Sequence, residues 1–328
     1  FVIVTDNMVQ GVNFLGAHID SPRLDLKPTP MYEEGGLCLL QTHYYGGIKK
    51  YQWVAMPLAL HGVVCKKDGS TVEIVIGEDL DDPVVEISDL LPHFGAEQMK
   101  KTASAVIEAE DMNVLVGSIP SSEEKEPVKK YILSLLKEKY DIEEDDFNSA
   151  ELEIVPAGRA RDCGIDRSMV MCYGQDDRAC AYTSFRAILS VELPKRTACC
   201  MLVDKEEIGS IGNTGMESRF FENTIAEVLD RLGMYSELNV RRCLSHSKVI
   251  SSDVAVGFDP NYPSISSKDN TAYFGKGLVM EKYTGSRGKY SATDANAEYL
   301  AQIRKCMDDQ NIVYQFAELG KIDAGGGG

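Results

Sequence analysis

The stretch TACCMLVDKEEIGS, residues 197–210, decides the fold of this chain. Its first part, Thr197–Val203, is a compact apolar run whose length fits a buried strand better than a helix. Two adjacent carboxylates, Glu206 and Glu207, follow the strand. Because like charges repel each other, both stay ionised only beside a positive charge, which a divalent metal ion would supply. Taken alone, the stretch fits two surface glutamates at a strand end equally well.

Helical and extended apolar segments alternate on both sides of this strand. Helices are expected where apolar residues recur at helical spacing, with Pro194 and Gly233 as stop signals. The expected helices are Ala179–Leu193, Arg219–Gly233 and Asp294–Asp309, and the other expected strands are Phe1–Thr5, Val12–Ala17, Val249–Val256 and Ile312–Ala317. Alternation of this kind predicts an α/β layered sheet.

A histidine and an aspartate follow the strand expected over Val12–Ala17, in the order His18-Ile19-Asp20. Residues two apart on an extended backbone point to the same side. One side chain can then bind a metal ion while the other orients it. A capped loop, with Asp20 bonded to backbone, is the alternative. The prolines at positions 22, 28 and 30 make the following segment extended or turned.

Three further aspartates stand near the ends of expected elements. Asp176 and Asp177 precede a helix, where an N-cap is the simplest role. Asp253 has apolar flanks, which favour a buried carboxylate that is paired or binds a cation. Together with the histidine and the two glutamates, they fall at the carboxyl ends of sheet elements, where open α/β sheets bind ligands. Such oxygen and nitrogen ligands suit a two-metal hydrolytic centre with ions roughly 3.5–4 Å apart.

The alternation of helical and extended apolar segments is interrupted between His61 and about Ile154. Gly62–Ile76 alternates apolar and polar residues around a Lys-Asp-Gly turn, which predicts a hairpin. Glu126–Tyr140 is expected to be an amphipathic helix, followed by a solvated acidic loop at Glu143–Asp146. The chain therefore divides into residues 61–154 and two flanking pieces of the α/β part. The tyrosines at 44, 45 and 51 are expected to pack at the junction.

Composition limits the partners that the chain can have. Of 328 residues, 44% are hydrophobic and 26% are charged, as in a globular protein, and no apolar stretch approaches the length of a membrane span. The net charge of −17 repels nucleic-acid phosphates and anionic lipid, so neither nucleic acid nor a membrane is an expected partner. Nine cysteines without C-x-x-C spacing indicate buried free thiols and favour the cytoplasm. Since the chain opens inside an expected strand and closes on four glycines, we expect residues beyond both ends.

Six motifs occur along the chain in a characteristic order. They are Gly16–Arg23, Tyr45–Ile48, Gln175–Asp177, Asp204–Ser210, Ser252-Asp253 and Gly285–Tyr290. This series resembles that of the aspartyl aminopeptidase family of di-zinc metallo-aminopeptidases, over essentially the whole chain. The resemblance implies a mixed-sheet α/β/α metallopeptidase (phosphorylase/hydrolase-like) catalytic domain formed by residues 1–60 and 155–328. Residues 61–154 would be an inserted β-rich dimerisation or lid domain.

The resemblance also implies the metal ligands. His18 and Asp253 would bind one ion, Asp176 would bridge two ions, and Glu207 would bind the second. A further histidine ligand comes, in the family, from a segment beyond the glycine run. Asp177 stands where the family usually has Asn. The implied cofactors are two divalent metal ions, zinc first, with cobalt or manganese as alternatives.

Two acidic residues would carry the chemistry. Glu206 would be the general base, taking a proton from water and returning it to the leaving amine. Asp20 would stand behind His18 and orient it. The implied reaction is metal-assisted removal of the N-terminal residue of a peptide, because the free α-amino group of the substrate must be bound.

Cationic residues bear on the choice of substrate. Lys282, Arg287 and Lys289 cluster in one loop of an acidic chain, which favours an N-terminal Asp or Glu through charge-assisted bonds. The resemblance points to Lys282 and Tyr290 as substrate contacts and to His93 as a residue that reaches the neighbouring subunit's site. The alternatives are a solvated basic loop and a histidine at a helix start or an interface.

Partners and competing functions complete the expectations. The resemblance implies peptide substrates and self-association into dimers and a tetrahedral dodecamer. An acyl-amino-acid deacylase on the same scaffold would differ in the pocket for the substrate amine. A non-catalytic, metal-stabilised assembly subunit is disfavoured by the adjacent glutamates, since a structural metal ion has no use for an extra base.

Overall fold

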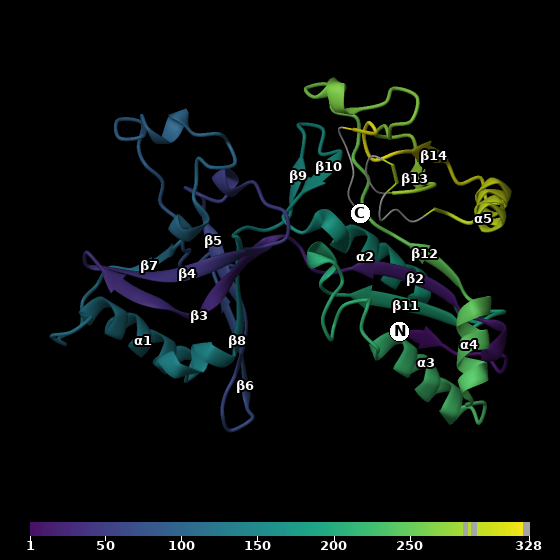
Figure 1. The fold of residues 1–328 in the computed structure, drawn as a ribbon, viewed down its shortest axis with the longest axis horizontal. Helices are drawn as coiled ribbons and strands as arrows, with labels where there is room; N and C mark the ends of the chain where they lie inside the picture. The colour runs from purple at the N-terminus through teal and green to yellow at the C-terminus, as the bar shows by residue number, and fades with distance from the viewer. Residues whose placement is uncertain (285–287, 290–293, 324–328) are drawn as a thin grey trace.

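The computed structural model describes residues 1–284, 288–289 and 294–323. Within these residues the chain forms two lobes, each built on its own sheet (Figure 1). One lobe holds a four-stranded sheet with helices against it, and the other holds a six-stranded sheet. The chain passes into the second lobe after residue 18 and leaves it after residue 156.

The four-stranded sheet positions the candidate site. Its strands, in spatial order, are β1 (Val2–Ile3), β11 (Ala198–Val203), β2 (Asn13–His18) and β12 (Lys248–Ser251). Strands β11 and β12 run parallel to the central β2, so the carboxyl ends of all three meet at one edge. Strand β1 pairs antiparallel with β11. The strands expected from the apolar runs are confirmed, with β12 ending five residues earlier than expected.

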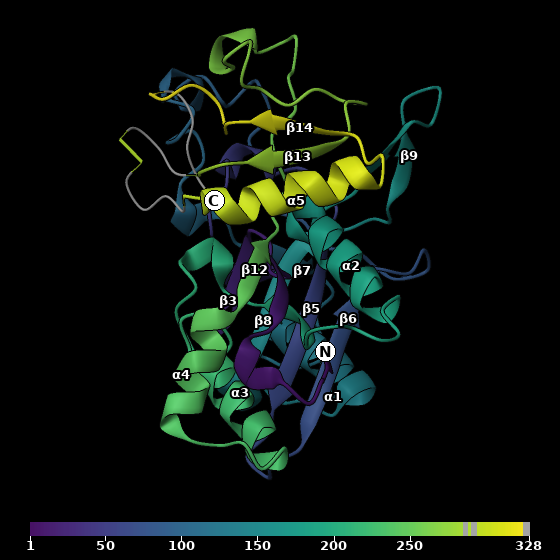
Figure 2. The same cartoon turned by 90° about the vertical axis from the view of Figure 1, so that its right-hand side faces the viewer.

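Three helices cover the two faces of this sheet. They are α2 (Gln175–Leu189), α3 (Phe220–Arg231) and α4 (Glu237–His246). Phe14 of β2 and Cys199 of β11 pack with Leu229 of α3 and Val240 of α4 in one apolar core. Helix α2 packs on the other face, so the lobe has the predicted α/β/α layers (Figure 2). Helix α4 was not predicted; its start is capped by Ser236, whose side chain accepts a hydrogen bond from the Asn239 amide.

The second sheet is antiparallel throughout. In spatial order its strands are β6 (Thr71–Ile76), β5 (Leu58–Cys65), β8 (Ala150–Pro156), β3 (Arg23–Glu34), β4 (Leu37–Tyr45) and β7 (Val114–Gly117). Helix α1 (Pro127–Tyr140) packs against β3, β4 and β7, and its residue Val128 belongs to the core of this lobe. The predicted hairpin and amphipathic helix are confirmed. The acidic stretch expected as a loop enters a 3-10 helix, Glu144–Ser149, with Glu143 as its capping residue.

Strands β3 and β4 belong to this second sheet although they precede residue 61. Leu24 of β3 lies opposite Ile154 of β8, and a register shift between Leu26 and Met31 lets the chain pass the prolines at 28 and 30. The sheet therefore begins earlier in the chain than the change of pattern indicates. The division of the chain into catalytic and inserted domains stays a prediction.

The remaining elements lie above the first lobe. They are the hairpin β9 (Arg161–Cys163) and β10 (Met169–Met171), the parallel pair β13 (Leu278–Glu281) and β14 (Tyr314–Ala317), and α5 (Ala297–Asp309). Helix α5 lies alongside β13 and β14 (Figure 2). The short 3-10 helices are Met8–Gln10, Lys50–Gln52, Gln98–Lys100, Ala109–Asp111, Glu206–Ile208 and Pro263–Ile265.

Two expectations from composition can be compared with the coordinates. Among the described residues, no helix combines the length and apolar character needed to cross a membrane. The nine cysteines are free thiols, as predicted. Four are buried, but Cys65 and Cys306 are exposed, so burial holds for part of the set.

Candidate metal centre

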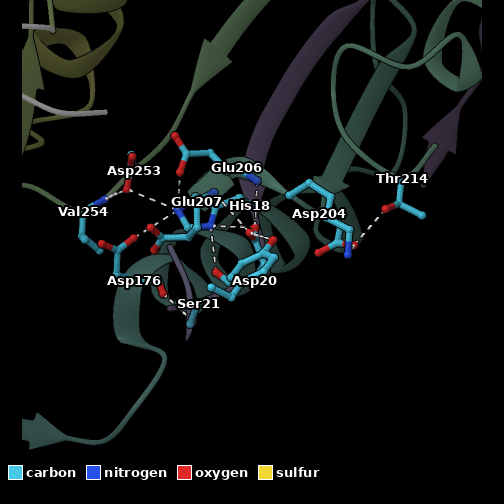
Figure 3. Close-up of polar contacts among 12 residues, drawn as sticks. His18, Asp20, Ser21, Asp176, Asp204, Glu206, Glu207, Thr214, Asp253 and Val254 are labelled. Carbon is cyan, nitrogen blue, oxygen red and sulfur yellow. Dashed lines mark hydrogen bonds and ion pairs between the residues drawn. The ribbon is translucent and has the colours of Figure 1, made fainter. Parts of the chain in front are cut away.

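The candidate site forms where three parallel strands end. His18 is the last residue of β2 and lies opposite Val203, the last residue of β11. Glu206 and Glu207 follow β11 in a 3-10 turn, and Asp253 follows β12 by two residues. Figure 3 shows that these side chains, together with that of Asp176 from the start of α2, converge on one region.

His18 lies at the middle of the group and is buried. Its Nε2 is 3.1 Å from Oδ1 of Asp176, 3.8 Å from Oδ1 of Asp253 and 3.9 Å from Oε2 of Glu206. Its Nδ1 lies 2.9 Å from the backbone oxygen of Asp20, which can only accept, so Nδ1 is protonated and Nε2 is the nitrogen that faces the carboxylates. Although burial opposes protonation, these carboxylates raise the pKa of His18.

Two sets of ligand atoms share this histidine. His18, Asp176 and Glu207 form one set, and His18, Asp177 and Asp253 form the other, with the atoms of each set within 4.8 Å of one another. The four residues that the sequence analysis assigned to metal binding are therefore brought together. Asp177, for which the sequence analysis suggested only an N-cap, joins the set that contains Asp253.

The donor set fits a divalent metal ion. Asp177 is completely buried, and neither of its carboxylate oxygens meets full hydrogen-bond geometry with a partner in the described part of the chain, although the backbone amide of Cys180 lies close by. The thiol of Cys180, a weak donor, lies beside it. Burial raises the pKa of Glu207 to about 7, with Asp176 and Glu206 adding to the shift, because carboxylates crowd together here. One imidazole nitrogen with several carboxylate oxygens is a ligand set that zinc accepts.

Asp20 ties the ends of two strands together. Its carboxylate is fully buried and accepts hydrogen bonds from the backbone amides of Glu206, at 3.1 Å, and Glu207, at 3.2 Å. The hydroxyl of Tyr45 donates a third, at 2.7 Å. Asp20 therefore orients His18 mainly through its backbone oxygen, while its side chain holds the two glutamates.

Glu206 stands beside both ligand sets and belongs to neither. About a third of its side chain is exposed, so its carboxylate has access to solvent. Asp253 is 40% exposed, and the expectation of a buried carboxylate is wrong. Its apolar neighbours Val254 and Val256 are themselves exposed, so they do not cover it.

Two contacts that hold the site were not predicted. The Ser21 hydroxyl donates to the backbone oxygen of Asp176 at 2.8 Å, which fixes the start of α2 against the loop after β2. Tyr45 was expected to pack at the junction, and its contact with Asp20 joins the six-stranded sheet to the loop after β2. Both residues occur in the motifs quoted above, but spacing alone does not identify a contact partner.

Of the proposed substrate residues, Lys282 and His93 are described and Tyr290 is not. Lys282 is exposed just after β13, and His93 is exposed in the segment between β6 and β7. Within the described ranges, neither has a contact with the two ligand sets. Tyr290 and Arg287 lie outside the described residues. Lys289 is described; its Nζ lies 3.6 Å from the ring centroid of Tyr283.

Comparison with known proteins places this geometry in context. Residues 1–328 match the family model described as aminopeptidase I zinc metalloprotease (M18). The chain is 58% identical to the probable M18 family aminopeptidase 1 of Clostridium acetobutylicum, over 100% of this chain and 71% of that protein. The crystal structure of aminopeptidase I from Clostridium acetobutylicum superposes with a TM-score of 0.92 at 57% identity, covering 100% of this chain and 71% of that one. The M18 aminopeptidase of Thermotoga maritima gives a TM-score of 0.94 at 46% identity, over 98% of this chain and 71% of that one.

Proposed function

Because the chain belongs to the aminopeptidase I (M18) family of zinc metalloproteases, we propose that it hydrolyses peptides with two zinc ions at the edge of the β2–β11–β12 sheet. Membership makes the protein a metallo-aminopeptidase, a hydrolase acting on peptides, and zinc its metal. The number of ions and the role of each residue are our proposal. Support for two ions comes from the two different pairs of carboxylates beside His18, Asp176 with Glu207 and Asp177 with Asp253.

His18, Asp253 and Asp176 would hold one ion, and Asp176 with Glu207 would hold the other. Asp177 would lie beside the first ion in this arrangement, because its ligand atom lies with those of His18 and Asp253. When bound, zinc polarises the scissile carbonyl and lowers the pKa of water. The chain's own residues must then supply the general base and fix the direction of attack.

The position of Glu206 carries the proposal. Its carboxylate lies 3.9 Å from His18 Nε2, yet it belongs to neither ligand set and is partly open to solvent. A carboxylate so placed can accept a proton from the attacking water and return it to the leaving amine. Asp20 fixes the backbone amide of Glu206 and so fixes the origin of this side chain. A metal that only stabilised the fold would leave this carboxylate without a task.

Substrate preference follows from charge. The Lys282 side chain, together with the basic loop that follows it, would favour an N-terminal Asp or Glu through charge-assisted hydrogen bonds. We therefore propose that the peptides cleaved most readily begin with Asp or Glu. Tyr290 would contact the substrate, and His93 would approach the site of a neighbouring subunit.

Assembly and location are proposed with the activity. Self-association into dimers and a tetrahedral dodecamer would cover the strongly exposed apolar side chains Leu80, Phe94 and Met99 of the second lobe. The free cysteines accord with a cytoplasmic enzyme. Sedimentation of the purified protein tests the assembly.

The test compares free and blocked amino groups. Zinc-loaded protein is assayed on the p-nitroanilides of Asp, Glu and Leu, beside the N-acetylated form of each. The proposal expects hydrolysis of the free forms, Asp and Glu ahead of Leu, and none of the blocked forms. Hydrolysis of the blocked forms would support the deacylase instead. Hydrolysis of neither form, with zinc bound, would support the non-catalytic assembly subunit.

A further inference from the structure

The carboxylate of Asp20 receives donors from both lobes. Two are the backbone amides of Glu206 and Glu207, which follow β11 of the first lobe. The third is the hydroxyl of Tyr45, the last residue of β4 in the six-stranded sheet, at 2.7 Å. This is the shortest of the three bonds, and both side chains are buried. The second lobe thus reaches the candidate base through one carboxylate.

The ring of Tyr45 is itself held in place. The guanidinium of Arg23 lies 3.9 Å from the ring centroid, and Arg23 is the residue opposite Tyr45 in the β3–β4 pairing. Arg23 in turn bonds Asp25 through Nε at 2.8 Å and Glu153 of β8 through a terminal nitrogen at 3.0 Å. A buried, doubly paired guanidinium is a stiff platform for a ring. Tyr45 therefore cannot turn away from Asp20 without breaking this stack.

We propose that Tyr45 is a positioning residue for the reaction. Acting through Asp20, its hydroxyl sets the placement of Glu206 and Glu207, and Arg23 fixes the ring that carries the hydroxyl. This inference rests on the proposed roles of Glu206 as base and Glu207 as metal ligand. It gives the six-stranded sheet a direct part in the catalytic geometry, in addition to any part in assembly.

The consequence of losing the hydroxyl can be stated for each glutamate. Without it, Asp20 keeps its two backbone donors but can rotate, because nothing on the side of β4 holds its carboxylate. Glu206 then loses its alignment with the attacking water, which lowers kcat and leaves KM unchanged. Glu207 loses its alignment as a ligand, which weakens zinc binding, as loss of groups that orient ligands does by about 10–100-fold.

The test replaces Tyr45 by Phe, which removes one oxygen and keeps the ring on Arg23. The matched control is Tyr44→Phe, the same change one residue earlier, on an exposed side chain that points to the opposite face of β4. We measure kcat and KM on an unblocked p-nitroanilide and, separately, zinc affinity by competition with a chromogenic chelator. Tyr45→Phe is expected to lower kcat about tenfold, keep KM within about twofold and weaken zinc binding about tenfold. Tyr44→Phe is expected to match the wild type.

Two results would overturn the inference. One is a Tyr45→Phe protein with wild-type kcat and wild-type zinc affinity; the other is an equal loss in Tyr44→Phe. The zinc measurement does not depend on turnover, so it tests Tyr45 even if the unmodified protein hydrolyses none of the chosen substrates. Absence of hydrolysis by the unmodified protein would count against the proposed function and not against the role of Tyr45.

A second variant tests the part played by Arg23. Arg23→Lys keeps the charge near Asp25 and Glu153 but removes the planar group that stacks on the ring. If Arg23 acts through Tyr45, the Arg23→Lys substitution lowers kcat when Tyr45 is present. In the Tyr45→Phe background it lowers kcat by less than a further factor of about two. If the two reductions of kcat multiply in the double variant, Arg23 acts independently of Tyr45, and its proposed role is wrong. Thermal melting of each variant identifies any that fails to fold.

Discussion

The Oε2 atom of Glu206 lies 3.9 Å from Nε2 of His18, while Glu206 takes part in neither set of ligand atoms around that histidine. Its neighbour Glu207, one residue along the same 3-10 turn, does take part. The adjacent glutamates therefore separate into a carboxylate that can move a proton and one that can hold a metal ion. The first prediction follows from that separation.

Glu206→Gln should abolish turnover while zinc content stays at the wild-type level. The amide cannot accept the proton of the attacking water, and loss of a general base costs about 10²–10⁴-fold in rate. Turnover is followed on an unblocked p-nitroanilide and zinc by atomic absorption. Glu227→Gln, the same change at an exposed position of α3, is the control and should retain activity. Loss of zinc from Glu206→Gln would make Glu206 a ligand instead of the base.

Metal-free protein should lose thermal stability as the pH rises from 5 to 8. Partial desolvation and the neighbouring carboxylates raise the pKa of Glu207 to about 7 and that of Asp253 to about 6, above their ordinary values of 4.5 and 3.8. Between the ordinary and the raised pKa of each group, the folded state binds more protons than the unfolded state. The free energy of unfolding therefore falls as the pH rises. Melting curves in EDTA measure the effect.

A matched variant identifies the origin of this pH dependence. Glu207→Gln removes one titrating carboxylate, so its metal-free protein should show a flatter fall in melting temperature over the same range. An unchanged slope in the variant, or a wild-type melting temperature that rises toward pH 8 in EDTA, would show that the crowded carboxylates do not govern stability here.

Asp177→Asn should stabilise the metal-free protein. The carboxylate is completely buried, and only the amide and thiol of Cys180 lie close to it among the described residues, neither at full hydrogen-bond geometry. The neutral amide therefore removes a buried charge without changing shape. The expected gain is roughly 1–3 kcal/mol in the free energy of unfolding, measured by urea titration in EDTA. Lower stability of Asp177→Asn in EDTA would mean that the carboxylate has a stabilising partner in the metal-free state.

Lys282→Ala should slow hydrolysis of Asp- and Glu-p-nitroanilide more than that of Leu-p-nitroanilide. A cation near an acidic side chain contributes a charge-assisted bond that a neutral substrate cannot use. The ratio of kcat/KM between Asp and Leu substrates reports this directly, and we expect it to fall about tenfold, the effect of one such bond. An equal loss on all three substrates would remove the specificity argument from Lys282.

The sequence predicted the α/β lobe well because its elements are marked locally. Thr197–Val203 and Val12–Ala17 are apolar runs with polar residues directly after them, and parallel pairing brings the carboxyl ends of such strands together. That pairing rule groups His18, Glu207 and Asp253 from the sequence alone. Chain order and local spacing contain enough information for this part of the site.

Other features depend on contacts that no local pattern expresses. Strand β3 contains two prolines and was expected only as an extended or turned segment; the register shift that accommodates them forms only against β4. The bond from Tyr45 to Asp20 joins the end of β4 to the loop after β2, and its existence follows from how the lobes meet. Exposure of Asp253 was likewise missed, because apolar flanking residues need not be buried themselves.

Zinc stoichiometry tests the central claim most directly. The purified protein is stripped with a chelator, titrated with zinc in a calorimeter and analysed for bound metal after gel filtration. Our account predicts two zinc ions for each chain, with Asp176→Ala losing both sites and Glu207→Ala losing one while keeping the other. A single zinc ion in the wild type, or two ions retained by Asp176→Ala, would contradict the proposed pair of ions held by these carboxylates.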